Sequence, residues 1–78
     1  MRKIAEVAVD VLTKLEDGGI PIIEVTLASP NVISVIIGKE ISAATIILWP
    51  EGAEDLTQHG SSGYYRDMVI VVWGVPRG

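Results

Sequence analysis

A polar segment, residues 50–67, interrupts an otherwise apolar chain and limits how this protein can build a core. Apolar residues make up 49% of the 78 residues, yet the segment contains only four of them: Ala53, Leu56, Tyr64 and Tyr65. It also contains the single histidine of the chain and three of its eight glycines. The core must therefore come from the flanking residues, and we expect any chemistry or recognition in the polar segment.

The chain length predicts one domain, residues 1–78, with one hydrophobic core. A core of this size is marginally stable unless disulfides, metals or subunit contacts support it. The sequence contains no cysteine, which excludes disulfides and thiolate metal sites and fits a cytoplasmic protein. Self-association is therefore the stabilising device that we expect.

The charge balance argues against nucleic-acid and membrane partners. Ten acidic and six basic residues give a net charge of -4, whereas nucleic-acid binding needs clustered Lys and Arg. The longest uncharged stretch, residues 25–38, is too short to span a bilayer as a helix. Glu6 and Asp10 interrupt the apolar region that a signal peptide would need. We expect a soluble, cytoplasmic protein without a cofactor.

Hydrophobic periodicity predicts one helix and then strands. Apolar residues at three- and four-residue steps predict a helix over residues 3–17, ended by a pair of glycines. From residue 20 the period changes to two and β-branched residues dominate, which predicts strands over 20–28, 32–37 and 41–49. The two connections between these strands are too short for a crossover, so we expect an antiparallel meander.

A last strand is predicted over residues 68–75, which are apolar at every side-chain position, as expected of a central strand buried on both faces. The predicted fold is α+β, an N-terminal helix packed on a four-stranded, mainly antiparallel sheet; a helix plus a small closed β-barrel is the alternative. One helix is about 10 Å wide and covers about two strands. A second copy, joined through sheet faces or edges, would cover the rest, which predicts a homodimer or higher homo-oligomer.

The start of the polar segment has the end signals of a short helix over residues 50–59. Pro50 suits the first helical position, and a glycine follows His59 where the helix would stop. On such a helix Glu51, Asp55 and His59 would share one face and could bind a divalent metal that assists assembly. The same residues also complement the helix ends, and we expect no metal.

Two catalytic motifs are considered and set aside. Asp55, His59 and either Ser61 or Ser62 are the residue types of a hydrolytic triad, but the segment lacks the spacing of a nucleophile elbow, so a solvated turn is the better interpretation. Gly38 and Lys39 follow an apolar strand without the upstream glycine of a phosphate-binding loop, and they predict a hairpin turn. We therefore expect no catalytic residues.

The predicted binding residues are His59, Tyr64, Tyr65 and Arg66. Tyrosine and arginine are favoured at interface hot spots, and the last three residues form the richest cluster of these types in the chain. The structural interpretation of the same cluster is that one tyrosine caps the edge of the core and the other covers a seam between subunits.

Two functions from different classes are compatible with these observations. The leading hypothesis is a small, soluble, homo-oligomeric interaction or structural module, non-enzymatic, that presents residues 50–67 to a protein partner. The alternative is a small oligomeric enzyme whose site forms at a subunit interface from His59, Asp55, either tyrosine and Arg66. An enzyme would hold His59 in a cleft, whereas a binding loop would leave it in water.

Overall fold

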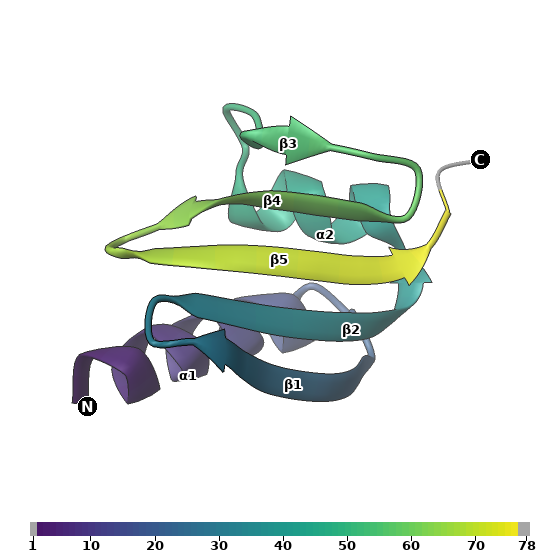
Figure 1. The fold of residues 1–78 in the computed structure, drawn as a ribbon. Coiled ribbons are helices and arrows are strands. Elements are labelled where there is room, and N and C mark those ends of the chain that lie inside the picture. Colours follow the sequence, from purple (N-terminus) through teal and green to yellow (C-terminus); the bar gives the residue numbers. More distant parts are fainter. Residues whose placement is uncertain (1, 77–78) are drawn as a thin grey trace.

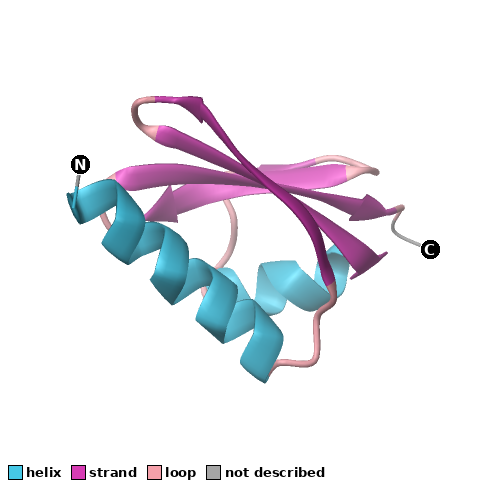
Figure 2. Ribbon diagram, turned by 90° about the horizontal axis from the view of Figure 1, so that it is seen from below, coloured by secondary structure: helices cyan, strands magenta, loops and turns pink. Residues whose placement is uncertain are grey.

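The computed structural model describes residues 2–76 and consists of two helices packed on one face of an open, five-stranded sheet (Figure 1, Figure 2). The helices are α1 (Arg2–Asp17) and α2 (Ile41–Leu48). The strands are β1 (Ile22–Ser29), β2 (Val32–Glu40), β3 (Asp55–Leu56), β4 (Gly60–Tyr65) and β5 (Met68–Val75). The predicted α+β class is confirmed, with five strands in place of four and an open sheet in place of a barrel.

The strands lie in the order β1-β2-β5-β4-β3 (Figure 1), so β5 is central, as its sequence predicts. Strand β2 pairs with β5 in parallel, and the other three pairs are antiparallel. The predicted meander is therefore wrong beyond its first hairpin. The connection from β2 to β5 contains α2 and the β3–β4 hairpin, which supplies the length that a parallel connection needs.

Helix α1 covers the sheet with the apolar stripe that its sequence predicts. Val7, Val11 and Leu15 are fully buried at steps of four residues. The helix closes where the Ile20 amide donates to the Leu15 carbonyl at 3.0 Å. Gly19 has a φ of 77° there, which glycine adopts without strain. No helix in the described part of the chain is both long and apolar enough to cross a membrane.

Residues 41–48 form helix α2, and the predicted third strand over 41–49 is wrong. The buried residues of α2 recur at helical steps: Ile41, Ala44, Thr45 and Leu48. The sequence hides this period because almost every residue of the run is apolar, so a buried helix and a buried strand look alike. Helix α2 lies against β2, β4 and β5 and also contacts α1.

The core lies between the helices and the sheet. Alternate residues of the two central strands point into it and are buried: Ile33, Val35 and Ile37 of β2, and Met68, Ile70 and Val72 of β5. The alternate residues of β5 point to the other face, where Val71 is half-buried and Trp73 is exposed. Strand β5 is central but helices cover only one of its faces, which corrects the expectation of burial on both.

The polar segment forms a hairpin, and the predicted helix over 50–59 is wrong. Its strands β3 and β4 are joined by a turn in which the Thr57 amide donates to the Gly60 carbonyl at 2.8 Å. The Gly60 amide donates to Thr57 Oγ1 at 2.9 Å, which closes the turn a second time. The solvated turn expected around Ser61 is instead part of β4, because the backbone there pairs with β5.

Candidate functional site

The second face of the sheet is open: both described helices lie on the opposite side (Figure 2). The centre of this open face is apolar, with half-buried Val69 and Val71 and exposed Trp73 along β5. Exposed Ile36 of β2 and Tyr64 of β4 extend it to the neighbouring strands. An apolar surface of this kind is typical of a binding surface.

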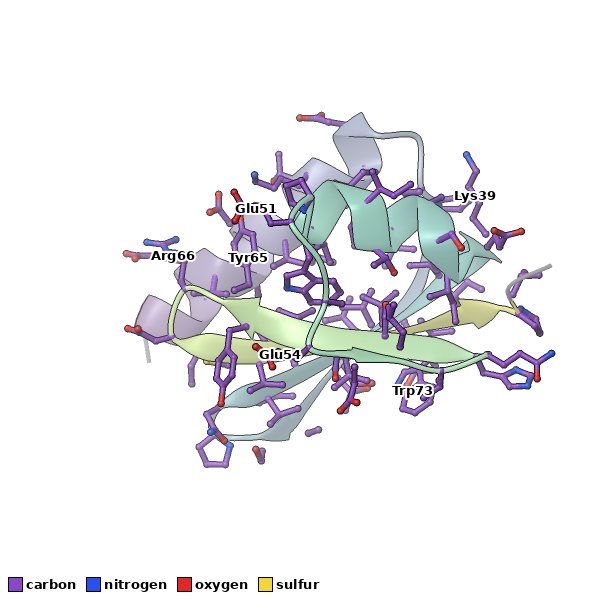
Figure 3. The ribbon with its side chains drawn as sticks, turned by 90° about the horizontal axis from the view of Figure 1, so that it is seen from above. Lys39, Glu51, Glu54, Tyr65, Arg66 and Trp73 are labelled. Carbon is purple, nitrogen blue, oxygen red and sulfur yellow. The ribbon has the colours of Figure 1, made fainter. Side chains whose placement is uncertain are left out.

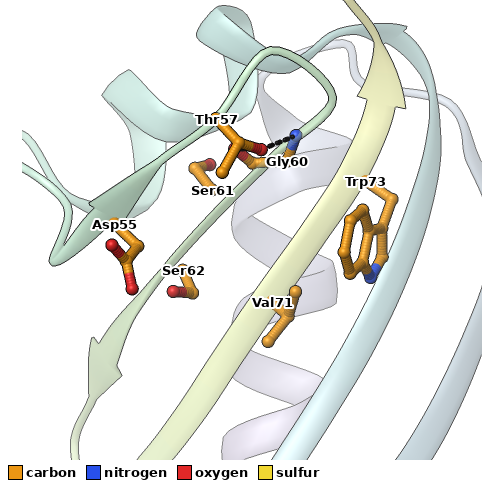
Figure 4. A pocket seen from close by; sticks show the side chains of 7 residues that line it. All are labelled: Asp55, Thr57, Gly60, Ser61, Ser62, Val71 and Trp73. Atoms are coloured by element: carbon orange, nitrogen blue, oxygen red, sulfur yellow. Dashed lines mark hydrogen bonds between the residues drawn. The ribbon is translucent and has the colours of Figure 1, made fainter.

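A pocket of about 250 Å³ lies on the open face beside the polar segment (Figure 4). Val71 and Trp73 of β5 form its apolar side. Residues of the β3–β4 hairpin line the rest of it: Asp55, Thr57, Gly60, Ser61 and Ser62. Among them, Asp55, Thr57 and Ser62 are polar and not buried. Three adjacent strands therefore build one small site with an apolar wall and a polar rim, the composition that is common among ligand pockets.

The indole of Trp73 is held from two sides. Its Nε1–H donates to Ser34 Oγ at 3.1 Å. Gly60 lies opposite Trp73 in the β4–β5 register, and a Cβ at Gly60 would come within 3.0 Å of the ring. The missing side chain lets the ring lie close to the β4 backbone, so Trp73 is a preorganised wall and not a freely rotating side chain.

Asp55 supplies the negative charge at the rim of the pocket. Asp55 pairs with Ser62 across the hairpin. The Asp55 carboxylate makes no hydrogen bond or ion pair within residues 2–76. Glu54 precedes it in the sequence and is also exposed. An unpaired carboxylate next to an apolar wall can accept hydrogen bonds from a donor that stacks on the indole.

The predicted binding residues do not come together within one chain. Exposed His59 directly precedes β4, whereas Tyr65 ends this strand and Arg66 follows it. At 3.3 Å per residue, His59 and Tyr65 are about 20 Å apart. Figure 3 shows Tyr65 and Arg66 at the opposite end of the sheet from Trp73. Exposed Tyr64 lies on the open face. The enzymatic alternative is therefore not assembled by a single copy.

Tyr65 and Arg66 both contact Asp10 of helix α1. Tyr65 Oη donates to Asp10 Oδ2 at 3.3 Å, and Arg66 Nη1 lies 3.4 Å from the same oxygen. The Lys14 ammonium lies 5.7 Å from the centre of the Tyr65 ring, within the range of a cation–π contact. Tyr65 also packs against the core. These contacts connect the β4–β5 turn to helix α1.

The structure does not bring together the residues of the metal hypothesis or those of the triad hypothesis. Glu51, Asp55 and His59 share no helix face, and the described residues contain no group of three His, Cys, Asp or Glu that could hold a metal ion. Ser61 is buried, and its hydroxyl lies 2.7 Å from that of Thr45 in α2. Its hydroxyl is therefore engaged in the interior and is not presented as a nucleophile.

The apolar wall of the pocket, Val71 and Trp73, was not among the predicted site residues. The expected strand over 68–75 was buried on both faces, which gave Trp73 no exposed position, and Gly60 opposite it was expected at the end of a helix. One signal was present: Trp73 has the same strand parity as Val69 and Val71, so it had to share their face. Which face the helices cover depends on helix α2, and residues 41–48 were expected to form a strand.

Comparison with known proteins identified no relative. No family model, no curated protein and no solved structure matches this chain. The function is therefore inferred from the geometry of the chain alone.

Proposed function

We propose that this protein is a small, non-enzymatic interaction module that self-associates through its sheet and binds a protein partner at the pocket beside residues 50–67. The observation that carries the proposal is the uncovered face of the sheet, on which Trp73 is 45% exposed yet held in a fixed orientation. A rigid, exposed aromatic residue next to polar groups is a common binding anchor.

The shape and charge of the pocket define the partner group that fits it. The wall formed by Val71 and Trp73 suits an apolar stem, and the Asp55 carboxylate suits a cationic end. The net charge of -4 favours a basic partner over an acidic one. An arginine or lysine side chain of a protein partner has both features.

The enzymatic alternative has less support. Its proposed residues are divided between the two ends of β4, and Arg66 and Tyr65 are engaged with Asp10. A second copy would have to bring His59 of one chain to Arg66 of the other, and no contact among residues 2–76 favours that arrangement.

An NMR titration with a single blocked amino acid tests the pocket. N-acetyl-arginine amide is the probe, and N-acetyl-glutamine amide, whose shorter side chain is polar but uncharged, is the control. We expect the arginine probe to shift the Trp73 indole resonance and the backbone amide of Ser62, because both border the pocket. The glutamine probe should produce smaller shifts.

Asp55→Asn is the matched variant, since it keeps the shape of the side chain and removes its charge. It should abolish the preference for arginine over glutamine. Equal shifts with both probes in the wild type, or shifts centred on Tyr65 and Arg66 instead, would contradict the proposed pocket. Sedimentation of the wild-type chain tests self-association separately, and a monodisperse monomer at micromolar concentration would refute that part.

A further inference from the structure

The two outer strands of the sheet differ in how they are protected. Outer strands carry unpaired backbone groups that can pair with another strand, and proteins limit this with short strands, charges or prolines. Strand β3 has two residues, and acidic Glu54 and Asp55 lie at its start. Strand β1 has eight residues, with Glu24 as its only charge and no proline or lysine. Its pairing with β2 has register shifts between Ile22 and Glu24 and between Leu27 and Ser29, so the regular part of the strand is residues 24–27. This regular part of the β1 edge is therefore open to pairing.

The helix-side face of β1 is apolar but uncovered. Val25 pairs with Val35 and Leu27 with Ile33, and both partners on β2 are buried. Val25 nevertheless remains 40% exposed and Leu27 53% exposed. The apolar layer of the core thus continues onto β1 beyond the area that the helices cover. An added strand with apolar residues at the same positions would bury part of this surface.

The backbone groups of Val25 and Leu27 also point outward. The Gly38 amide donates to the Pro21 carbonyl at 2.9 Å, which identifies Ile22 and Ile37 as a pair that does not exchange hydrogen bonds.

The pairs Val25–Val35 and Leu27–Ile33 also do not exchange hydrogen bonds. The two pair types alternate along an antiparallel ladder, and Val35 and Ile33 are two and four positions from Ile37 on β2. In such pairs the N–H and C=O groups of both residues point away from one another. The amides and carbonyls of Val25 and Leu27 therefore lie on the free edge.

We infer that β1 pairs in antiparallel fashion with β1 of a second copy, about a two-fold axis at Thr26. This deepens the proposed self-association through the sheet and rests on it. The axis places Val25 opposite Leu27 of the second copy, so the outward backbone groups bond to each other and the two exposed apolar side chains meet. Thr26 faces Thr26 across the axis, a favourable cross-strand pair.

Charge and chain geometry favour a second copy as the occupant. In this register Glu24 lies opposite Ala28 of the second copy, so the two glutamates of the joined strands are not opposed. Pro21 and Pro30 flank the strand and limit the length that can pair to β1 itself. A second copy provides a strand of the same length and the same apolar pattern. Pairing at the β1 edge also leaves the open face and its pocket free for the partner.

Two matched leucines test which edge is used. Leu27 on β1 is 53% exposed and Leu56 on β3 is 58% exposed, so Leu27→Lys and Leu56→Lys place the same charge on the two edges at similar exposure. We expect sedimentation to show that Leu27→Lys is a monomer and that Leu56→Lys remains a dimer like the wild type. Circular dichroism of both variants verifies that they fold.

A single-cysteine variant tests the register without weakening the edge. The chain has no cysteine, and the inferred axis brings the two Thr26 Cα atoms to about 4.5 Å, within disulfide range. Thr26→Cys should form a covalent dimer under mild oxidation, and Leu56→Cys should not.

The outcomes separate the two proposals. A wild-type dimer that survives Leu27→Lys and shows no Thr26→Cys cross-link would overturn the β1 pairing and leave self-association through another part of the sheet standing. A wild-type monomer would overturn both.

Discussion

Thr45 and Ser61 form a buried hydroxyl pair that connects helix α2 to strand β4, with 2.7 Å between their oxygens. Thr45 Oγ1 also donates to the Ile41 carbonyl at 3.0 Å. Because a threonine hydroxyl has one proton, Ser61 must be the donor of the bond between them. The pair is therefore directional, and its two members should differ in their contribution to stability.

Thr45→Val should destabilise the fold more than Ser61→Ala. The valine leaves the Ser61 hydroxyl buried without an acceptor, which costs about 1–3 kcal/mol, whereas the alanine leaves Thr45 bonded to Ile41 and costs about 1 kcal/mol. Urea denaturation measures both values. The double variant should lose less free energy of unfolding than the sum of the two, and strict additivity would contradict the pair.

Gly63→Ala should be destabilising because the Trp49 side chain fills the space beneath this glycine, on the helix side of β4. A Cβ at Gly63 would lie 2.6 Å from the indole Nε1, which donates to the Tyr64 carbonyl at 2.9 Å. Overpacking of this kind costs about 1–3 kcal/mol. Gly38→Ala is the control, since its Cβ would be 3.5 Å from the nearest atom. Thermal unfolding should show a lower Tm for the first variant only.

Arg66 adopts a φ of 59°, in the left-handed region that favours glycine. Its ion pair with Asp10 is half exposed at both ends and contributes little. Arg66→Gly should therefore be more stable than Arg66→Ala by about 1 kcal/mol, because both lose the ion pair and only alanine retains the backbone strain. Chemical denaturation of the two variants measures the difference; alanine equal to or above glycine would show that the strain is absent.

Leu15→Ala should lower the free energy of unfolding by about 2–5 kcal/mol, since Leu15 is fully buried between α1 and the rest of the core. Val9 lies on the same helix and is 62% exposed. Val9→Ala should change stability by less than about 0.5 kcal/mol. Denaturation at one protein concentration compares them, and similar losses for both would mean that α1 does not pack through the Val7, Val11 and Leu15 stripe.

Helix α1, the β1–β2 hairpin and the central position of β5 were predictable, because each depends on a local pattern. The three- and four-residue steps of α1 and the period of two in β1 are present in the sequence, and a strand apolar at every position belongs in the middle of a sheet. Asp55 was named only in the metal, triad and enzymatic hypotheses, because of its spacing from His59, and not among the predicted binding residues.

The hairpin at 55–65 and helix α2 depended on one another and were not predictable separately. Ser61 and Gly63 are small because α2 and Trp49 lie directly beneath them, a contact across 14 or more residues of sequence that no local pattern records. Read alone, these small residues indicate a turn. Likewise, the apolar run at 41–48 has no visible period, and only the available space under β4 and β5 selects the helix.

By itself, the sequence determined the fold class, the first helix, the first hairpin and the need for a cover on the apolar sheet. Only the tertiary structure decided which face the helices cover, and therefore that Trp73 and Asp55 border one pocket and that β1 keeps a free apolar edge. The physical reason is that strand periodicity states which side chains share a face, whereas burial of that face depends on elements packed against it from elsewhere in the chain.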